Sequence, residues 1–178
     1  QELKERGAFS NASTWTDRTI YFEEMVSTSE NIDFALRFEA DRMQNALIGD
    51  PALASEMTVV RNEFEMKESD PLEIVLQSLM AGGYTWHPYG AATIGNRSDI
   101  ERVPGENLRR FYKHFYRPSN AMLIVSGKFD DADVLNRIDT HFSPLDNPPA
   151  PLTPTWTEEP TQDGSRLVEI CRDITQAS

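Results

Sequence analysis

The sequence predicts an α+β fold in which helices pack on one face of a sheet. Five stretches carry apolar residues at helical spacing, and several of them begin with a capping residue or an Asp-Pro pair. Three short stretches are instead rich in strand-forming residues or wholly apolar. Because long helical hairpins stand between these strand segments, we expect the helices to cover a sheet.

The three strand segments differ in character. Arg18 to Met25 alternates along its length and is rich in β-forming residues, which predicts a strand. Ala121 to Val125 is wholly apolar, as expected for a central, buried strand. A proline-rich stretch, Pro144 to Pro160, predicts an extended surface connector, and the strand-like run Arg166 to Cys171 follows it.

The first helix is predicted from a capping box, with Ser27 as N-cap and Glu30 three residues later. One apolar stripe continues from there and indicates an end near Gly49. The stripe consists of Ile32, Leu36, Ala40, Met43 and Leu47.

The second helix is predicted to begin at Asp50-Pro51, a capping carboxylate followed by proline at the first helical position. Glu56 and Glu63 are two turns apart, so their side chains point the same way. They lie at the rim of the apolar stripe, where a carboxylate needs a partner. Without other information, a charged network with the nearby Arg61 and Lys67 is the favoured interpretation of this pair. The stripe consists of Leu53, Met57, Val60 and Phe64.

The remaining helices have similar start and stop signals. Asp70-Pro71 begins the third helix and Gly82-Gly83 ends it. Pro104 opens the fourth helix and Pro118 closes it. Asp130 or Asp131 caps the fifth helix, whose inward residues are predicted to be Val134, Leu135, Ile138 and Phe142.

Composition narrows the function classes. The 178 residues suit one domain, and 39% hydrophobic with 26% charged residues is typical of a soluble globular protein. A formal net charge of -12 argues against nucleic acid and anionic membranes as partners. No signal peptide or membrane-spanning run is visible. The single cysteine, Cys171, cannot form an internal disulfide and is expected to be buried in a strand.

Histidine motifs for a metal site are missing. His87, His114 and His141 share no HxxH, HxxxH, HExxH or HxxEH spacing. His87 in its loop is expected to be structural, His114 to lie on the surface, and His141 to sit at a helix C-terminus, where a cation is favoured. On motifs alone, the chain is an α+β domain with an unexplained pair of glutamates.

Five segments, taken in order, resemble the pitrilysin/insulinase family of zinc peptidases. The resemblance is to a bacterial-type member, more distant from insulin-degrading enzyme and mitochondrial processing peptidase. It covers roughly residues 7 to 130. The matching segments are Ser10–Thr14 with Asp17–Tyr21, Glu39–Met43, Glu56–Glu63, His87–Gly90 with Ile94-Gly95 and Asp99-Ile100, and Phe111–Ala121 with Gly127–Asp130.

The resemblance implies a zinc site shared with another segment. The family holds one zinc ion with two histidines of an HxxEH helix and a glutamate from a later helix, which Glu63 matches. Glu56 matches a second carboxylate that supports a zinc-ligating histidine, as such imidazoles usually require. The glutamate of HxxEH acts as general base toward the zinc-bound water.

The HxxEH motif is absent from this chain, and in the family it precedes the first matching segment. The upstream histidines are therefore expected before residue 1, no catalytic residue is expected within the chain, and the isolated fragment is predicted to be inactive. The implied fold is a metallopeptidase half-domain with a mixed, mainly antiparallel sheet. Residues 1–178 would form a single, incomplete amino-terminal domain, with a ligand-helix part (1–103) and a sheet-and-helix part (104–178).

The resemblance also implies partners. Asn11 and Ala12 match the edge strand against which a peptide substrate lies as an added strand. A second peptidase half or partner subunit would complete the binding chamber, and bacterial relatives suggest the periplasm or secretion. The alternative is a catalytically inactive, peptide-binding partner subunit of the same fold. Retention of both Glu56 and Glu63 favours the active type.

Overall fold

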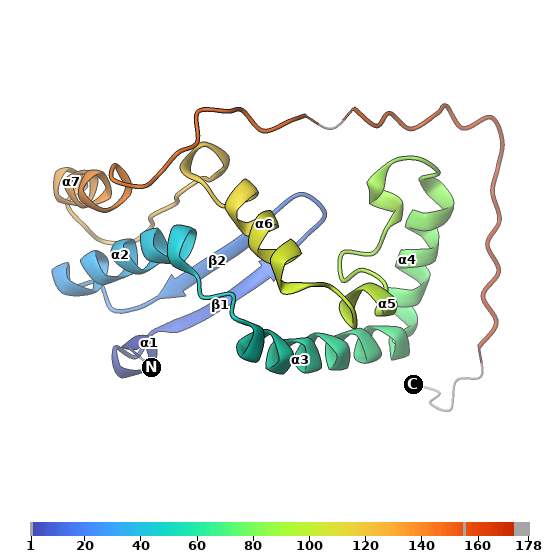
Figure 1. Ribbon diagram of the computed structural model, residues 1–178, viewed down its shortest axis with the longest axis horizontal. Coiled ribbons are helices and arrows are strands. Elements are labelled where there is room, and N and C mark those ends of the chain that lie inside the picture. Colours follow the sequence, from blue (N-terminus) through green and yellow to red (C-terminus); the bar gives the residue numbers. More distant parts are fainter. Residues whose placement is uncertain (1, 155, 173–178) are drawn as a thin grey trace. The chain divides into compact units, whose positions relative to one another are not determined.

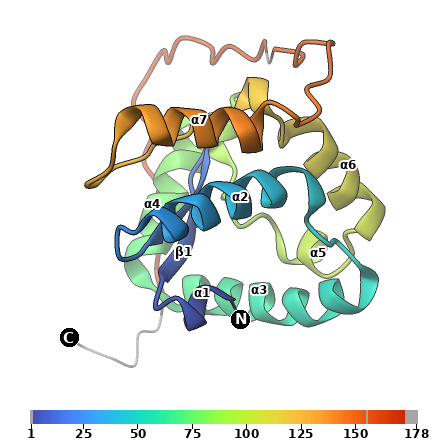
Figure 2. The ribbon, with the colours of Figure 1, turned by 90° about the vertical axis from the view of Figure 1, so that its left-hand side faces the viewer.

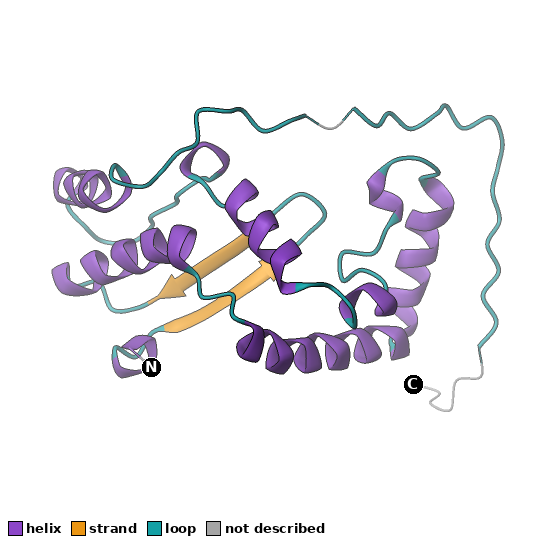
Figure 3. Cartoon of the chain, viewed as in Figure 1, coloured by secondary structure: helices purple, strands orange, loops and turns teal. Residues whose placement is uncertain are grey.

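The computed structural model describes residues 2–154 and 156–172, apart from the side chain of Asp50 (Figure 1). The described chain divides into two compact units. The first contains residues 2–50 and 104–153, and the second contains residues 51–103, 154 and 156–172. Figure 3 shows that helices dominate both units. No described helix is long and apolar enough to cross a membrane.

A β-hairpin forms the sheet of the first unit. β1 (Phe9–Thr14) pairs antiparallel with β2 (Thr19–Glu24), from Phe9 opposite Glu24 to Thr14 opposite Thr19. The strand predicted from Arg18 to Met25 is therefore confirmed. The expected mixed sheet is wrong, since the described residues form only this two-stranded antiparallel pair.

Helices cover one face of the hairpin, as predicted. Tyr21 and Glu23 are two residues apart on β2 and so share a face. The Tyr21 hydroxyl lies 2.7 Å from the hydroxyl of Tyr116, just after α6 (Gly105–Phe115). Arg42 of α2 (Ser29–Asn45) donates to Glu23, and its guanidinium lies 4.4 Å from the centre of the Tyr21 ring. Two helices are thus fixed to the hairpin by polar contacts.

The small apolar core of the first unit involves α2 and α7 (Asp131–Phe142), which run side by side in Figure 2. Asp130 caps α7 by accepting a hydrogen bond from Asp133 N at 2.9 Å, one of the two predicted possibilities. Leu135 was expected to face inward but is exposed, because it lies 100° around the helix from buried Val134. The buried apolar residues here are Phe34, Leu36, Ala40 and Val134.

Helix α2 begins and ends differently from the prediction. Its N-cap is Thr28, which accepts from Asn31 N at 3.2 Å, while the Ser27 hydroxyl instead donates to the carbonyl of Lys128. Glu30, the expected capping-box partner, pairs with Arg6 at 2.9 Å.

The end of α2, expected near Gly49, comes at Asn45. The Tyr112 hydroxyl donates to the carbonyl of Arg42 at 2.6 Å and accepts from Ala46 N at 3.0 Å. These two backbone groups would otherwise form the next helical hydrogen bond. A side chain from α6 therefore terminates the helix.

The second unit is built on α3 (Asp50–Ser69) and α4 (Pro71–Gly83). Asp70 caps α4 as predicted, accepting from Leu72 N at 2.8 Å and Glu73 N at 3.4 Å. The expected cap of α3 by Asp50 involves a side chain outside the described residues. Three short helices complete the two units: α1 (Glu2–Glu5), α5 (Arg97–Ile100) and α6, which begins after Pro104 as predicted. Single 3-10 turns lie at Pro88–Gly90 and Pro118–Asn120.

Two predicted strands are not formed. Among the described residues, residues 121–127 make one backbone hydrogen bond, from Ala121 N to Pro118 O at 3.2 Å, and Met122 is 85% exposed. Residues 166–171 are also unpaired and exposed, so the expected burial of Cys171 in a strand is wrong. A strand needs a neighbouring backbone to satisfy its amides and carbonyls, and no described segment supplies one here. The proline-rich stretch 144–160 is irregular where it is described, as expected for a connector.

Candidate functional site

Helix α3 carries the two glutamates singled out by the sequence. Leu53, Met57, Val60 and Phe64 are all half-buried, so the predicted apolar stripe is confirmed. Glu56 and Glu63 are exposed beside it. Seven residues separate them, or about 10 Å along the helix axis. That separation suits one metal ligand and one supporting carboxylate better than two ligands of the same ion.

The two glutamates differ in their surroundings. The Glu63 carboxylate lies 3.3 Å from Lys67 Nζ, one turn later, and its side chain is 54% exposed. Glu56 makes no hydrogen bond or ion pair with any described residue. Of the charged network considered for this face, the contact with Lys67 is formed and one with Arg61 is not.

The chain does not hold a complete metal centre within its described part. No group of three or more His, Cys, Asp or Glu residues there could bind an ion. A catalytic zinc site needs three protein ligands, so these residues do not fit the ion by themselves. Glu63 can contribute one carboxylate to such a site. Its role as a metal ligand and the role of Glu56 as a supporting carboxylate stay predictions.

The histidines have the ordinary settings expected from sequence. His87 Nδ1 accepts from Tyr89 N at 3.2 Å, and its ring contacts Tyr84 and Tyr89. His114 is exposed against the ring of Phe115. His141, in the last turn of α7, is engaged in a helix-to-helix contact.

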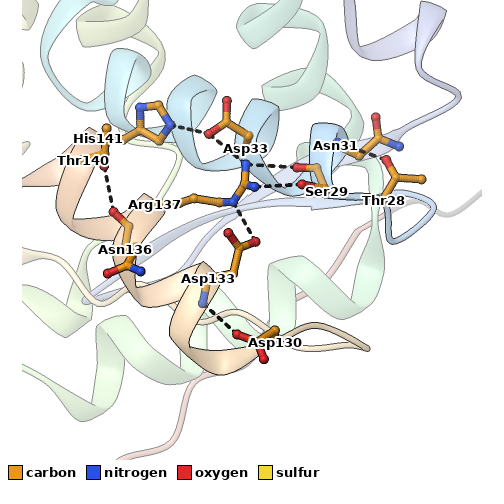
Figure 4. Close-up of polar contacts among 10 residues, drawn as sticks. All are labelled: Thr28, Ser29, Asn31, Asp33, Asp130, Asp133, Asn136, Arg137, Thr140 and His141. Carbon is orange, nitrogen blue, oxygen red and sulfur yellow. Dashed lines mark hydrogen bonds and ion pairs between the residues drawn. The ribbon is translucent and has the colours of Figure 1, made fainter.

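That contact is a polar cluster between α2 and α7, which sequence reasoning missed (Figure 4). His141 Nε2 lies 2.9 Å from Asp33, and Arg137 Nη1 lies 3.2 Å from the same carboxylate. Arg137 also bonds the Ser29 hydroxyl at 2.8 Å and Asp133 at 2.9 Å. The hydrogen bond from His141, followed by the charges of His141 and Arg137, lowers the pKa of Asp33 despite its partial desolvation. The cluster holds the two helices together, and it is not a group of residues that could bind a metal ion.

The predicted substrate strand has one free edge. β1 pairs with β2 alone among the described residues, and all of its residues are exposed. The backbone N–H of Ala12 donates to the side-chain oxygen of Asn11 at 2.8 Å. Edge strands are open to pairing with another chain, and polar side chains can occupy such edges. Asn11 therefore covers an amide that an added strand could use.

Glu159, in the proline-rich connector, is a further residue that the sequence did not single out. It accepts hydrogen bonds from three consecutive backbone amides, Thr85 to His87. No local pattern around this glutamate would reveal the contact, because its partners lie more than 70 residues away in the sequence.

Comparisons with known proteins agree with the resemblance read from the sequence. Residues 1–97 match the family described as Insulinase (Peptidase family M16), and residues 102–178 match the Peptidase M16 inactive domain. The chain is 30% identical over 174 residues to the zinc protease PqqE of Helicobacter pylori, covering 96% of this chain and 38% of that protein. It is 26% identical over 144 residues to the mitochondrial-processing peptidase subunit beta of Neurospora crassa, covering 81% of this chain and 30% of the relative.

Solved structures give the same fold. A protease from Helicobacter pylori superposes with a TM-score of 0.85 at 28% identity, covering 92% of this chain and 40% of that one. The first half of the periplasmic protease PqqL from Escherichia coli gives a TM-score of 0.68 at 22% identity, covering 81% and 32%. The chain spans well under half the length of these relatives. The family match over more than half of its residues shows that the chain belongs to the insulinase family of peptidases, peptidase family M16.

Proposed function

We propose that the chain is part of a zinc-dependent endopeptidase that hydrolyses extended peptides, and that the chain by itself is inactive. The observation that carries this proposal is the exposed Glu63 on α3, within the region that matches the insulinase family. Relatives named as zinc proteases support it. The missing ligands would come from histidines outside residues 1–178.

Glu63 is suited to serve as the one metal ligand from this chain. Its contact with Lys67 is a solvent-exposed pair one turn apart, a kind worth roughly 0.3–0.5 kcal/mol. A metal ion would therefore displace the lysine at small cost. Glu56 has no competing partner among the described residues, so its carboxylate is free to accept an imidazole N–H. When bound, zinc would supply Lewis-acid chemistry.

The free edge of β1 is the proposed peptide-binding element. An extended peptide would pair with the β1 backbone around Asn11 and Ala12. The Asn11 side chain would then have to release the Ala12 amide. Such backbone pairing explains binding of extended chains with little sequence preference.

The proposed peptidase also requires further parts outside this chain. The 178 residues would form one incomplete amino-terminal domain, completed by a second peptidase half or a partner subunit. A solved structure of the same fold is titled as the first half of a periplasmic protease, and we propose a periplasmic or secreted location for this protein as well.

A catalytically inactive, peptide-binding partner subunit is the second candidate. The match of residues 102–178 to the Peptidase M16 inactive domain supports it. The free edge of β1 would serve this role unchanged.

Metal analysis separates the two candidates. Zinc content and cleavage of an unstructured peptide are measured for residues 1–178 and for the longest natural polypeptide that contains them. The enzyme predicts about one zinc and activity in the longer form only. Glu63→Gln should remove both, while Glu68→Gln, at an exposed position on the same helix, should not. A longer form without zinc would leave the partner subunit as the function.

A further inference from the structure

Three backbone amides in the loop after α4 converge on one carboxylate. Glu159 Oε1 accepts from Thr85 N at 2.7 Å, and Oε2 accepts from Trp86 N and His87 N, both at 2.9 Å. Successive N–H groups that point to one centre form an anion-binding nest. The anion in this nest belongs to the chain itself and comes from a segment more than 70 residues away.

The nest holds the carboxylate in its charged form. Desolvation raises the pKa of Glu159, but the hydrogen bonds from the backbone of Thr85, His87 and Trp86 together outweigh it and lower the pKa to about 2. The Glu159 carboxylate is therefore charged at neutral and mildly acidic pH.

Two arginines of the same segment bind the ends of the helices. Arg166 Nη1 donates to the carbonyl of Gly82 at 2.7 Å and to the Thr85 hydroxyl at 2.9 Å. Arg172 Nη1 donates to the carbonyl of Glu68 at 3.2 Å. Both carbonyls lie in the last turn of a helix, α4 and α3, where carbonyls lack helical partners and cations are favoured.

The segment also packs closely on α4. A Cβ placed at Gly82 would lie 3.2 Å from Cγ2 of Val168, whereas one at Gly83 would meet nothing within 4 Å. Gly82 thus permits an approach that a larger residue would hinder. The contact adds a packing constraint between the two arginines.

We propose that residues 159–172 form a strap fastened across the ends of α3 and α4, and that the binding of Glu159 in the nest of residues 85–87 is its latch. The latch fixes the first residue of the strap, and the contacts of Arg166 and Arg172 fix the path of the strap over the two helices. The strap is thereby held on the second unit, with its backbone exposed. This device is independent of zinc and of the proposed peptidase activity.

The single cysteine allows a direct test. Cys171 lies in the strap, is exposed, and is the only cysteine in the chain, so a nitroxide attached there reports strap mobility. Glu159→Ala should narrow the spectrum of the label and speed amide exchange of Thr85 to His87 about tenfold, the effect of losing a charged hydrogen bond. Glu159→Gln, which keeps an acceptor, should give a smaller change. Glu158→Ala, at the neighbouring glutamate, is the matched control and should match the unsubstituted protein.

A second pair of variants tests whether the strap packs against α4 at Gly82. Gly82→Ala should narrow the label spectrum because the new methyl group contacts Val168, and Gly83→Ala should not. The proposal is overturned if Glu159→Ala leaves both the label and the amides of residues 85–87 unchanged. It is also overturned if the amides all along α4 lose protection from hydrogen exchange to the same extent in the Glu159→Gln variant. Glu159 would then stabilise the helix and not the strap.

Discussion

Replacing Arg42 by alanine should destabilise the first unit by about 3 kcal/mol, the low end of the range for breaking a buried ion pair. Arg42 is the only charged partner that the described residues give to Glu23, whose side chain is 5% exposed. Its guanidinium also lies 4.4 Å from the Tyr21 ring and 4.9 Å from the Phe38 ring, so cation–π attraction is lost as well. Without Arg42, the Glu23 carboxylate stays buried and unpaired.

The matched control is Arg37→Ala on the same helix. Arg37 is 58% exposed and lies 3.7 Å from an exposed Glu2, a pair expected to contribute at most about 1 kcal/mol. In urea, with a slope of about 1.5 kcal/mol/M, Arg42→Ala should lower the unfolding midpoint by about 2 M. Exchange of α2 amides during the titration assigns the transition to the first unit.

A double variant tests the cause of the loss. Arg42→Ala with Glu23→Gln should recover part of the lost stability, because a buried amide costs less than a buried carboxylate. The reasoning is refuted if Arg42→Ala and Arg37→Ala shift the midpoint equally. It is also refuted if the double variant recovers nothing.

Three further predictions concern single contacts. Tyr112→Phe should destabilise the first unit by about 1–2 kcal/mol and let α2 extend by a residue, which urea unfolding and NMR chemical shifts would measure. Because the folded pKa of Asp33 is lowered, its contribution to stability is present above the ordinary carboxyl pKa of 3.8 and is lost as the pH falls through the folded value. His141→Ala should therefore raise the Asp33 midpoint in an NMR titration, and an unchanged midpoint would contradict the assigned cause. Asn11→Ala should accelerate hydrogen exchange of the Ala12 amide several-fold, because the substitution removes the acceptor of that amide. The amides of β2 serve as the internal control.

The candidate site was predictable from sequence only as far as single helices and strands. The half-buried stripe of α3 and the exposed positions of Glu56 and Glu63 follow from helical periodicity, which acts over a few residues. Periodicity does not give the positions of the two further ligands that we propose, because it describes only one face of a single helix. The hydrogen bond from the Ala12 amide to the Asn11 side chain was not predictable from the sequence either, because only the paired hairpin shows which edge of β1 is free.

The sequence by itself determined features set by neighbouring residues. The cap of α4 at Asp70, the strand around Thr19–Glu24 and the family membership all rest on local patterns. The tertiary structure decided features that require distant partners. Tyr112 ends α2 by inserting its hydroxyl between Ala46 and Arg42, and no segment that the structure describes gives residues 121–125 the neighbouring backbone that a strand needs. Glu159 finds its amides more than 70 residues away. Hydrogen-bonding groups must be satisfied by whatever the folded chain brings near, and a local pattern does not contain that information.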